Sequence, residues 1–70
     1  MNTDTLLHDI RNPLNGIAMN AELAKLILQT SGDTAKALIA LETILKNCQI
    51  CSEKLSVLKQ VLDTTLDESD

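Results

Sequence analysis

The sequence predicts an all-α fold, in which an antiparallel hairpin of two helices dimerises into a four-helix bundle. The 70-residue chain has no aromatic residue, and 44% of it is hydrophobic, so its core must be built from aliphatic side chains. Apolar residues recur at alternating spacings of three and four along two long stretches, as in bundled helices. A short polar segment, "TSGD", separates the two stretches. Together these features predict one helical domain over residues 1–70.

The first helix is expected over about residues 4–30. The segment "NTDT" precedes it and supplies capping oxygens and an acidic group for the first turn. Its apolar residues form one stripe along the helix. The stripe consists of Leu7, Ile10, Leu14, Ile17, Ala21, Ala24 and Leu28. We expect this stripe to form the core face of the helix.

The second helix is expected over about residues 34–66, after a turn at about residues 31–33. Gly32 suits the end of the first helix, and Asp33 or Thr34 suits the N-cap of the second. A second stripe follows the same spacing: Ala37, Leu41, Ile44, Cys48, Cys51, Leu55, Leu58 and Leu62, widened by Leu38, Leu45, Val57 and Val61. So short a connection returns the chain antiparallel to the first helix.

A single hairpin of this size buries too little surface to be stable alone, and two wide apolar stripes need a further cover. We therefore expect a homodimer with two-fold symmetry. The sequence has neither an apolar run long enough to span a membrane nor a secretory signal, so we expect no membrane contact and a cytoplasmic location. With only six Lys and Arg against ten Asp and Glu, we expect no binding to nucleic acid.

The single histidine, His8, is expected on the solvent side of the first helix. At 100° per residue, it lies opposite the apolar stripe. Asn12 and Asn15 fall on the same outer side, and Asp9 is rotated from it by one step. An exposed histidine beside an aspartate is usually only a surface residue, so spacing alone assigns no chemistry to this polar strip.

Pro13 and Gly16 are costly residues for a helix interior. Pro13 has no N–H to donate to the carbonyl of Asp9, so the helix should bend or loosen beside His8. Relative to alanine, a proline costs about 3 kcal/mol in an exposed helix and a glycine about 1 kcal/mol. Gly16 is expected to remove a side chain from the same outer surface. A purely structural helix has little reason to carry both.

Several other features admit a structural explanation. Cys48 and Cys51 form a C-x-x-C motif, but both lie in the apolar stripe, so we expect buried, reduced thiols and no metal site. Leu23 is expected to pack in a second layer, whereas Met19 and Leu26 suit either that layer or an exposed docking surface. Charged side chains are expected on solvated faces: Glu22, Lys25, Glu42, Lys46, Glu53, Lys54 and Lys59.

The string "HDIRNPLNGI" closely resembles the H-box of sensor histidine kinases, His-(Glu/Asp)-hydrophobic-Arg-(Asn/Thr)-Pro-Leu, and matches it at every position through Leu14. The match lies on the first of two antiparallel helices, as in the dimerisation and histidine-phosphotransfer (HisKA-type) domain of these kinases. The resemblance therefore covers essentially the whole chain, although only about seven residues are specific. It implies the dimerisation and phosphoacceptor domain of a two-component phosphorelay.

The resemblance also implies a role for each residue of the motif. His8 would be the phosphoacceptor, and Asp9 its hydrogen-bond partner and proton acceptor. Asn12 would position the water that dephosphorylates a response regulator. Arg11 and Pro13 would support the site, through charge near the phosphate and through the helix bend. His8 would then pass its phosphoryl group to an aspartate of a response-regulator receiver domain.

The family's ATP-binding domain is missing from this sequence, which has no glycine-rich phosphate loop. The chain alone is therefore not expected to act as a kinase, and ATP and Mg²⁺ would be held by a separate catalytic domain. We expect Asn15, Met19 and Leu26 to form the docking surface for a receiver domain. Two alternatives remain open: a histidine phosphotransfer module without kinase activity, and a structural bundle that dimerises or sequesters a partner.

Overall fold

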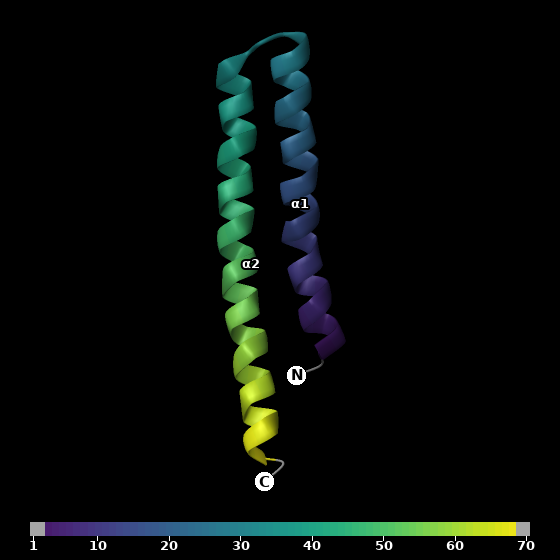
Figure 1. The fold of residues 1–70 in the computed structure, drawn as a ribbon, viewed down its shortest axis with the longest axis vertical. Helices are drawn as coiled ribbons and strands as arrows, with labels where there is room; N and C mark the ends of the chain where they lie inside the picture. The colour runs from purple at the N-terminus through teal and green to yellow at the C-terminus, as the bar shows by residue number, and fades with distance from the viewer. Residues whose placement is uncertain (1–2, 69–70) are drawn as a thin grey trace.

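The computed structural model describes residues 3–68, so the first two and last two residues of the expected domain lie outside it. Helix α1 runs from Thr3 to Thr30 and helix α2 from Thr34 to Glu68. The two helices lie side by side and antiparallel, and α2 extends beyond the N-terminal end of α1 (Figure 1). The hairpin measures 58 × 16 × 13 Å. The predicted helical-hairpin fold is confirmed.

The turn is closed by hydrogen bonds at both helix ends. The backbone N–H groups of Ser31 and Gly32 donate to the carbonyl of Ile27 at 3.0 and 2.9 Å. Gly32 has a φ of 66°, in the left-handed region that a side chain disfavours. The carboxylate of Asp33 accepts from the backbone N–H of Lys36 at 3.2 Å, which caps the start of α2. This chemistry reverses the chain within three residues.

The contact between the helices is made mainly by aliphatic side chains of both helices. The buried residues are Leu6, Ile10, Pro13 and Ala24 on α1, with Ala37, Ala40 and Cys51 on α2. Small side chains let the helix axes approach closely, and the thiol of Cys51 lies 3.8 Å from the carbonyl oxygen of Ile10, to which it donates. We call this contact the hairpin interface.

Eight residues of the expected core lie outside the hairpin interface. These residues follow one another at intervals of seven: Leu7, Leu14, Ala21 and Leu28 on α1, and Leu41, Cys48, Leu55 and Leu62 on α2. The six leucines are 44–52% exposed. Because the helices are antiparallel, equal rotations away from their contact line bring both rows to the same side of the hairpin. We call this side the heptad face.

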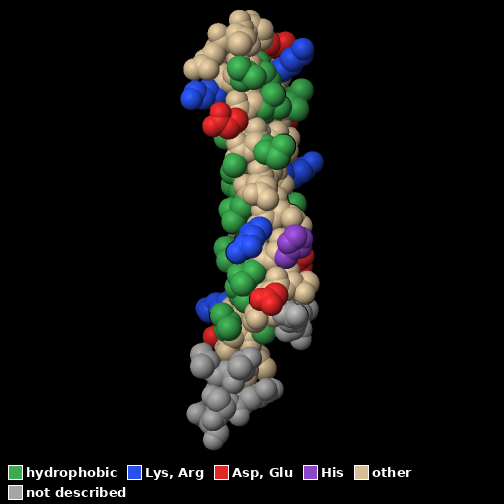
Figure 2. Space-filling view, turned by 90° about the vertical axis from the view of Figure 1, so that its right-hand side faces the viewer, with side chains coloured by type: hydrophobic (Ala, Val, Ile, Leu, Met, Phe, Trp, Pro, Cys, Tyr) green, Lys and Arg blue, Asp and Glu red, His purple; other side chains and the backbone are tan. Residues whose placement is uncertain are grey.

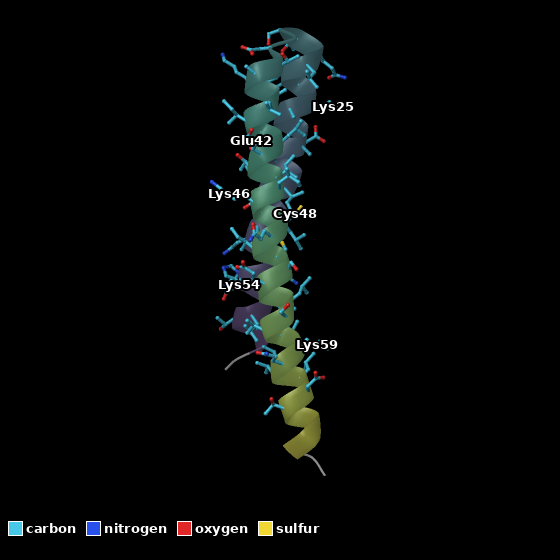
Figure 3. The ribbon with its side chains drawn as sticks, turned by 90° about the vertical axis from the view of Figure 1, so that its left-hand side faces the viewer. Lys25, Glu42, Lys46, Cys48, Lys54 and Lys59 are labelled. Carbon is cyan, nitrogen blue, oxygen red and sulfur yellow. The ribbon has the colours of Figure 1, made fainter. Side chains whose placement is uncertain are left out.

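In the single hairpin the heptad face is exposed, as expected for apolar stripes that need a further cover. Each stripe is wider than one helix–helix contact, so the helices meet along one edge of it and leave the other edge open. Leu6, outside the predicted stripe, is buried instead. Cys51 is buried as expected, whereas Cys48 is exposed. In Figure 3, Cys48 projects from the same side of the hairpin as Lys25 and Lys59, opposite to Lys46 and Lys54.

Candidate functional site

His8 lies in the second turn of α1 and is exposed, as the helical periodicity predicts. Leu6 and Ile10, two residues before and after it, are both buried in the hairpin interface. These two anchors fix the rotation of α1 and direct His8 away from α2. Figure 2 shows the histidine, coloured purple, on the surface of the hairpin. The imidazole is therefore accessible to a large reactant.

The other residues of the polar strip differ in exposure. Asn12 and Asn15 are exposed, one and two helical turns beyond His8, and Arg11 is exposed between the strip and the heptad face. Asp9 is half-buried, because its position on the helix is turned toward α2. Asp9 thus lies on the side of His8 that is nearer to α2, and Asn12 lies on the side that is nearer to the turn between the helices.

Pro13 is buried against α2, and α1 continues through it without a break. The proline cannot donate to the carbonyl of Asp9, so that backbone hydrogen bond of the helix is missing. The neighbouring carbonyl of Ile10 accepts from Cys51 of α2. The weakened turn of α1 therefore lies directly beside His8 and faces the hairpin interface rather than solvent.

Gly16 does not face the outer surface, which corrects the sequence-based expectation. It is half-buried, and a Cβ built on it would lie 2.5 Å from Nδ2 and 3.2 Å from Cγ of Asn47 on α2. On the next turn, the side chain of Asn20 donates to the carbonyl of Gly16 at 2.8 Å. The glycine is explained by this close approach of a polar side chain from α2. The periodicity of α1 alone gives no sign of it.

Replacing Gly16 by alanine tests this approach. The substitution should gain about 1 kcal/mol of helix propensity but displace the amide of Asn47, so its net effect in the native chain should be near zero or destabilising. In an Asn47→Ala background the displacement disappears, and Gly16→Ala should then stabilise the hairpin. Urea unfolding of the four chains of this double-mutant cycle should give a coupling energy of about 1 kcal/mol. Additive effects would show that the two residues do not pack together.

The expected docking residues lie on the outer surface of α1. Asn15 and Leu26 are exposed, and Met19 is 72% exposed. Leu23 is also exposed in the single hairpin. A shallow open hollow beside these residues is lined by Glu22, Leu23, Lys25, Leu26 and Gln29. Three exposed apolar side chains, Met19, Leu23 and Leu26, thus lie on α1 between His8 and the turn, among polar and charged neighbours.

Lys54 lies in a position that sequence reasoning did not predict. It was expected on a solvated face, but it is half-buried at the hairpin interface. Its row on α2 repeats every seven residues as Ala40, Asn47, Lys54 and Val61. A lysine in a row otherwise made of small or apolar residues and Asn47 is the signal that could have found it. Within residues 3–68, no three His, Cys, Asp or Glu side chains gather in a way that could hold a metal ion.

The structure thus combines an exposed histidine beside an aspartate with a helical hairpin that has an open apolar face. The family model of the His Kinase A (phospho-acceptor) domain matches residues 3–70, and the chain belongs to this family. It is thus a phosphoacceptor and dimerisation domain of the histidine kinases of two-component signalling. Neither the curated proteins nor the solved structures contain a significant match. No helix in the described part of the chain meets the length and hydropathy needed to cross a membrane.

Proposed function

We propose that His8 is the residue that accepts the phosphoryl group and passes it to an aspartate of a response-regulator receiver domain. The observation that carries this proposal is the exposure of His8 within "HDIRNPL", on the face of α1 opposite the hairpin interface. A phosphoacceptor must approach two large reactants in turn, and both can reach an imidazole that neither helix covers.

The proposed phosphoryl transfer begins with a neutral imidazole, in which one ring nitrogen has a free lone pair and can act as the nucleophile. One ring nitrogen attacks the γ-phosphorus of ATP, forming an N–P bond as the P–O bond to the leaving ADP breaks. The proton on the other ring nitrogen is held by the carboxylate of Asp9. In the second step a receiver aspartate attacks phosphorus, the N–P bond breaks, and neutral imidazole is restored. In a separate reaction, Asn12 would orient the water that dephosphorylates the response regulator.

In this proposal a separate ATP-binding domain holds ATP and Mg²⁺. Phosphoryl transfer needs a set of groups that positions the phosphates and stabilises their charge, and these groups occur together in one site. We place the reaction in the cytoplasm, where ATP is available. Asn15, Met19 and Leu26 form the proposed docking surface for the receiver domain. Their support is that they are exposed, on the same outer side of α1 as His8.

A homodimer through the heptad face is the second part of the proposal. Eight residues at seven-residue intervals lie on one side of the hairpin, and the leucines among them are about half exposed. A lone hairpin of this size would leave that apolar surface in water, whereas a second copy covers it and completes a four-helix bundle. The family to which the chain belongs is itself a dimerisation domain.

Phosphorylation of the purified chain tests the assignment of His8. The chain is incubated with phosphoramidate, and separately with labelled ATP and the ATP-binding domain of a histidine kinase. We expect one phosphoryl group per chain, labile in acid and stable in alkali as a phosphoramidate bond is, and mapped to His8 by mass spectrometry. Subsequent addition of a receiver domain should move the label to the receiver. A label on another residue, or no label from either donor, would contradict the proposal.

Crosslinking tests the heptad face. In a bundle whose two-fold axis runs along its length, each Cys48 lies at the same height as Cys48 of the other copy, whereas Cys51 is enclosed in its own hairpin. A short bis-maleimide should therefore join the native chain into a covalent dimer. The Cys51→Ser variant should give the same yield, and the Cys48→Ser variant should give none. A dimer that forms through Cys51 instead would place the contact elsewhere.

A further inference from the structure

Lys54 differs from the other lysines of the described chain because it is half-buried. Among residues 3–64, whose exposure is described, all charged side chains are exposed except Asp9, Asp33 and Lys54. Asp33 caps α2 at the turn. The remaining two, one acidic and one basic, come from opposite helices and are both turned toward the hairpin interface.

The register of the hairpin places Asp9 and Lys54 opposite each other. Gly16 faces Asn47, as the close approach of the Asn47 amide shows. In an antiparallel pair, a step of seven residues backward on α1 matches a step of seven forward on α2 and returns to the same face. This step leads from Gly16 to Asp9 and from Asn47 to Lys54.

A second contact supports the same register. Cys51, one turn before Lys54, donates to the carbonyl of Ile10, the residue after Asp9. Figure 3 shows Lys54 on the side of the hairpin that carries Lys46, away from Cys48 on the heptad face. Dimerisation through the heptad face would therefore leave Lys54 and Asp9 uncovered, where a reaction at His8 can use them.

Asp9 thus lies between two side chains that can each donate a hydrogen bond to its carboxylate. His8 lies on its outer side, and Lys54 of α2 lies on its inner side. A carboxylate has two oxygens, and each can accept a hydrogen bond from a different donor. Activated nucleophiles commonly have their acid–base partner oriented by a third group.

We propose that Lys54 is a positioning residue for phosphorylation of His8, an inference that rests on the proposed function of His8. As the imidazole attacks phosphorus and gains positive charge, the ammonium of Lys54 donates to one carboxylate oxygen of Asp9. The other oxygen is thereby held toward the imidazole N–H. Lys54 touches neither ATP nor the transferred phosphoryl group. Its effect on the reaction passes through Asp9.

Three variants of the full chain test the role of Lys54. Lys54→Met keeps the long side chain at the interface but removes the ammonium. Lys54→Arg keeps the charge and the donor. Lys46→Met is the matched control, because Lys46 is an exposed lysine on the same side of α2. With phosphoramidate as donor, Lys54→Met should phosphorylate about tenfold more slowly than the native chain. Lys54→Arg should recover most of the rate, and Lys46→Met should match the native chain.

The coupling to Asp9 separates positioning from a structural role. In an Asp9→Asn background, Lys54→Met should cause no further loss of rate, because the group through which it acts is already absent. The ¹³C resonance of the Asp9 carboxylate in NMR spectra should shift in Lys54→Met and not in Lys46→Met. Loss of helicity in Lys54→Met without that shift would indicate packing alone and overturn the inference.

The two proposals fail in distinguishable ways. If the native chain accepts no phosphoryl group from any donor, the function of His8 is refuted, while the Asp9 resonance still reports whether Lys54 engages the carboxylate. If the native chain is phosphorylated but Lys54→Met reacts at the native rate with an unshifted Asp9 resonance, the role of Lys54 is refuted and that of His8 stands.

Discussion

Replacing His8 by glutamine is expected to abolish phosphorylation of the chain by every donor. Glutamine is similar in length to histidine and favours a helix, but its amide nitrogen has no lone pair available to attack phosphorus. No other histidine is present in the sequence to take its place. His8 is exposed, and the buried residues Leu6 and Ile10 hold this part of α1 against α2. The substitution should therefore change the free energy of unfolding by less than about 0.5 kcal/mol.

The measurement is label incorporation over time, with the circular dichroism spectrum and the unfolding midpoint recorded on the same samples. Thr5→Gln is a suitable control. Thr5 is exposed in the first turns of α1, and its substitution introduces the same glutamine side chain. It should be phosphorylated like the native chain. Label that persists in His8→Gln would identify a different acceptor and leave the exposed imidazole without the role proposed for it.

The hairpin and the outward direction of His8 follow from the spacing of apolar residues, because a helix of 3.6 residues per turn converts spacing directly into direction. Ile10 and Ala24 lie in the predicted stripe and are buried, and His8, opposite them, is exposed. The turn was equally predictable, since Gly32 and Asp33 carry the chemistry that helix ends require. These features depend on one helix or one turn at a time.

Which edge of each apolar stripe packs in the hairpin interface depends on both helices together, and the sequence does not determine it. Leu6 and Leu7 are adjacent leucines, yet only Leu6 is buried. Gly16 faces α2 because Asn47 lies at the matching height, a pairing fixed by the register of the hairpin. A stripe that serves two contacts, one within the chain and one proposed between chains, looks the same in the sequence as a stripe that serves one wide contact.

Lys54 illustrates a different limit. A lysine is normally assigned to solvent, but its aliphatic stem can pack at an interface while the ammonium remains near water. Periodicity can therefore place a lysine in an interface row, but it does not show how far its side chain is buried. The structure identifies the unusual position of Lys54, because it shows that Lys54 and Asp9 are both half-buried on facing helices.

Replacing Leu14 by aspartate is expected to break the proposed dimer. Leu14 is 49% exposed in the hairpin, so a single chain should accommodate a carboxylate there at little cost. In the bundle, two-fold symmetry would bury two carboxylates in an apolar core, which costs several kcal/mol. Ile39→Asp is the matched control, because Ile39 is 63% exposed on the outer side of α2, away from the heptad face.

Sedimentation should thus show Leu14→Asp as a monomer at concentrations where the native chain and Ile39→Asp are dimers. The unfolding midpoint of the native chain should rise with protein concentration, because association stabilises the folded state by mass action. That dependence should be lost in Leu14→Asp, together with most of the stability, since one hairpin buries too little apolar surface by itself. If both aspartate variants remained dimeric with the same concentration dependence, the contact between chains would lie on a face other than the one marked by the seven-residue rows.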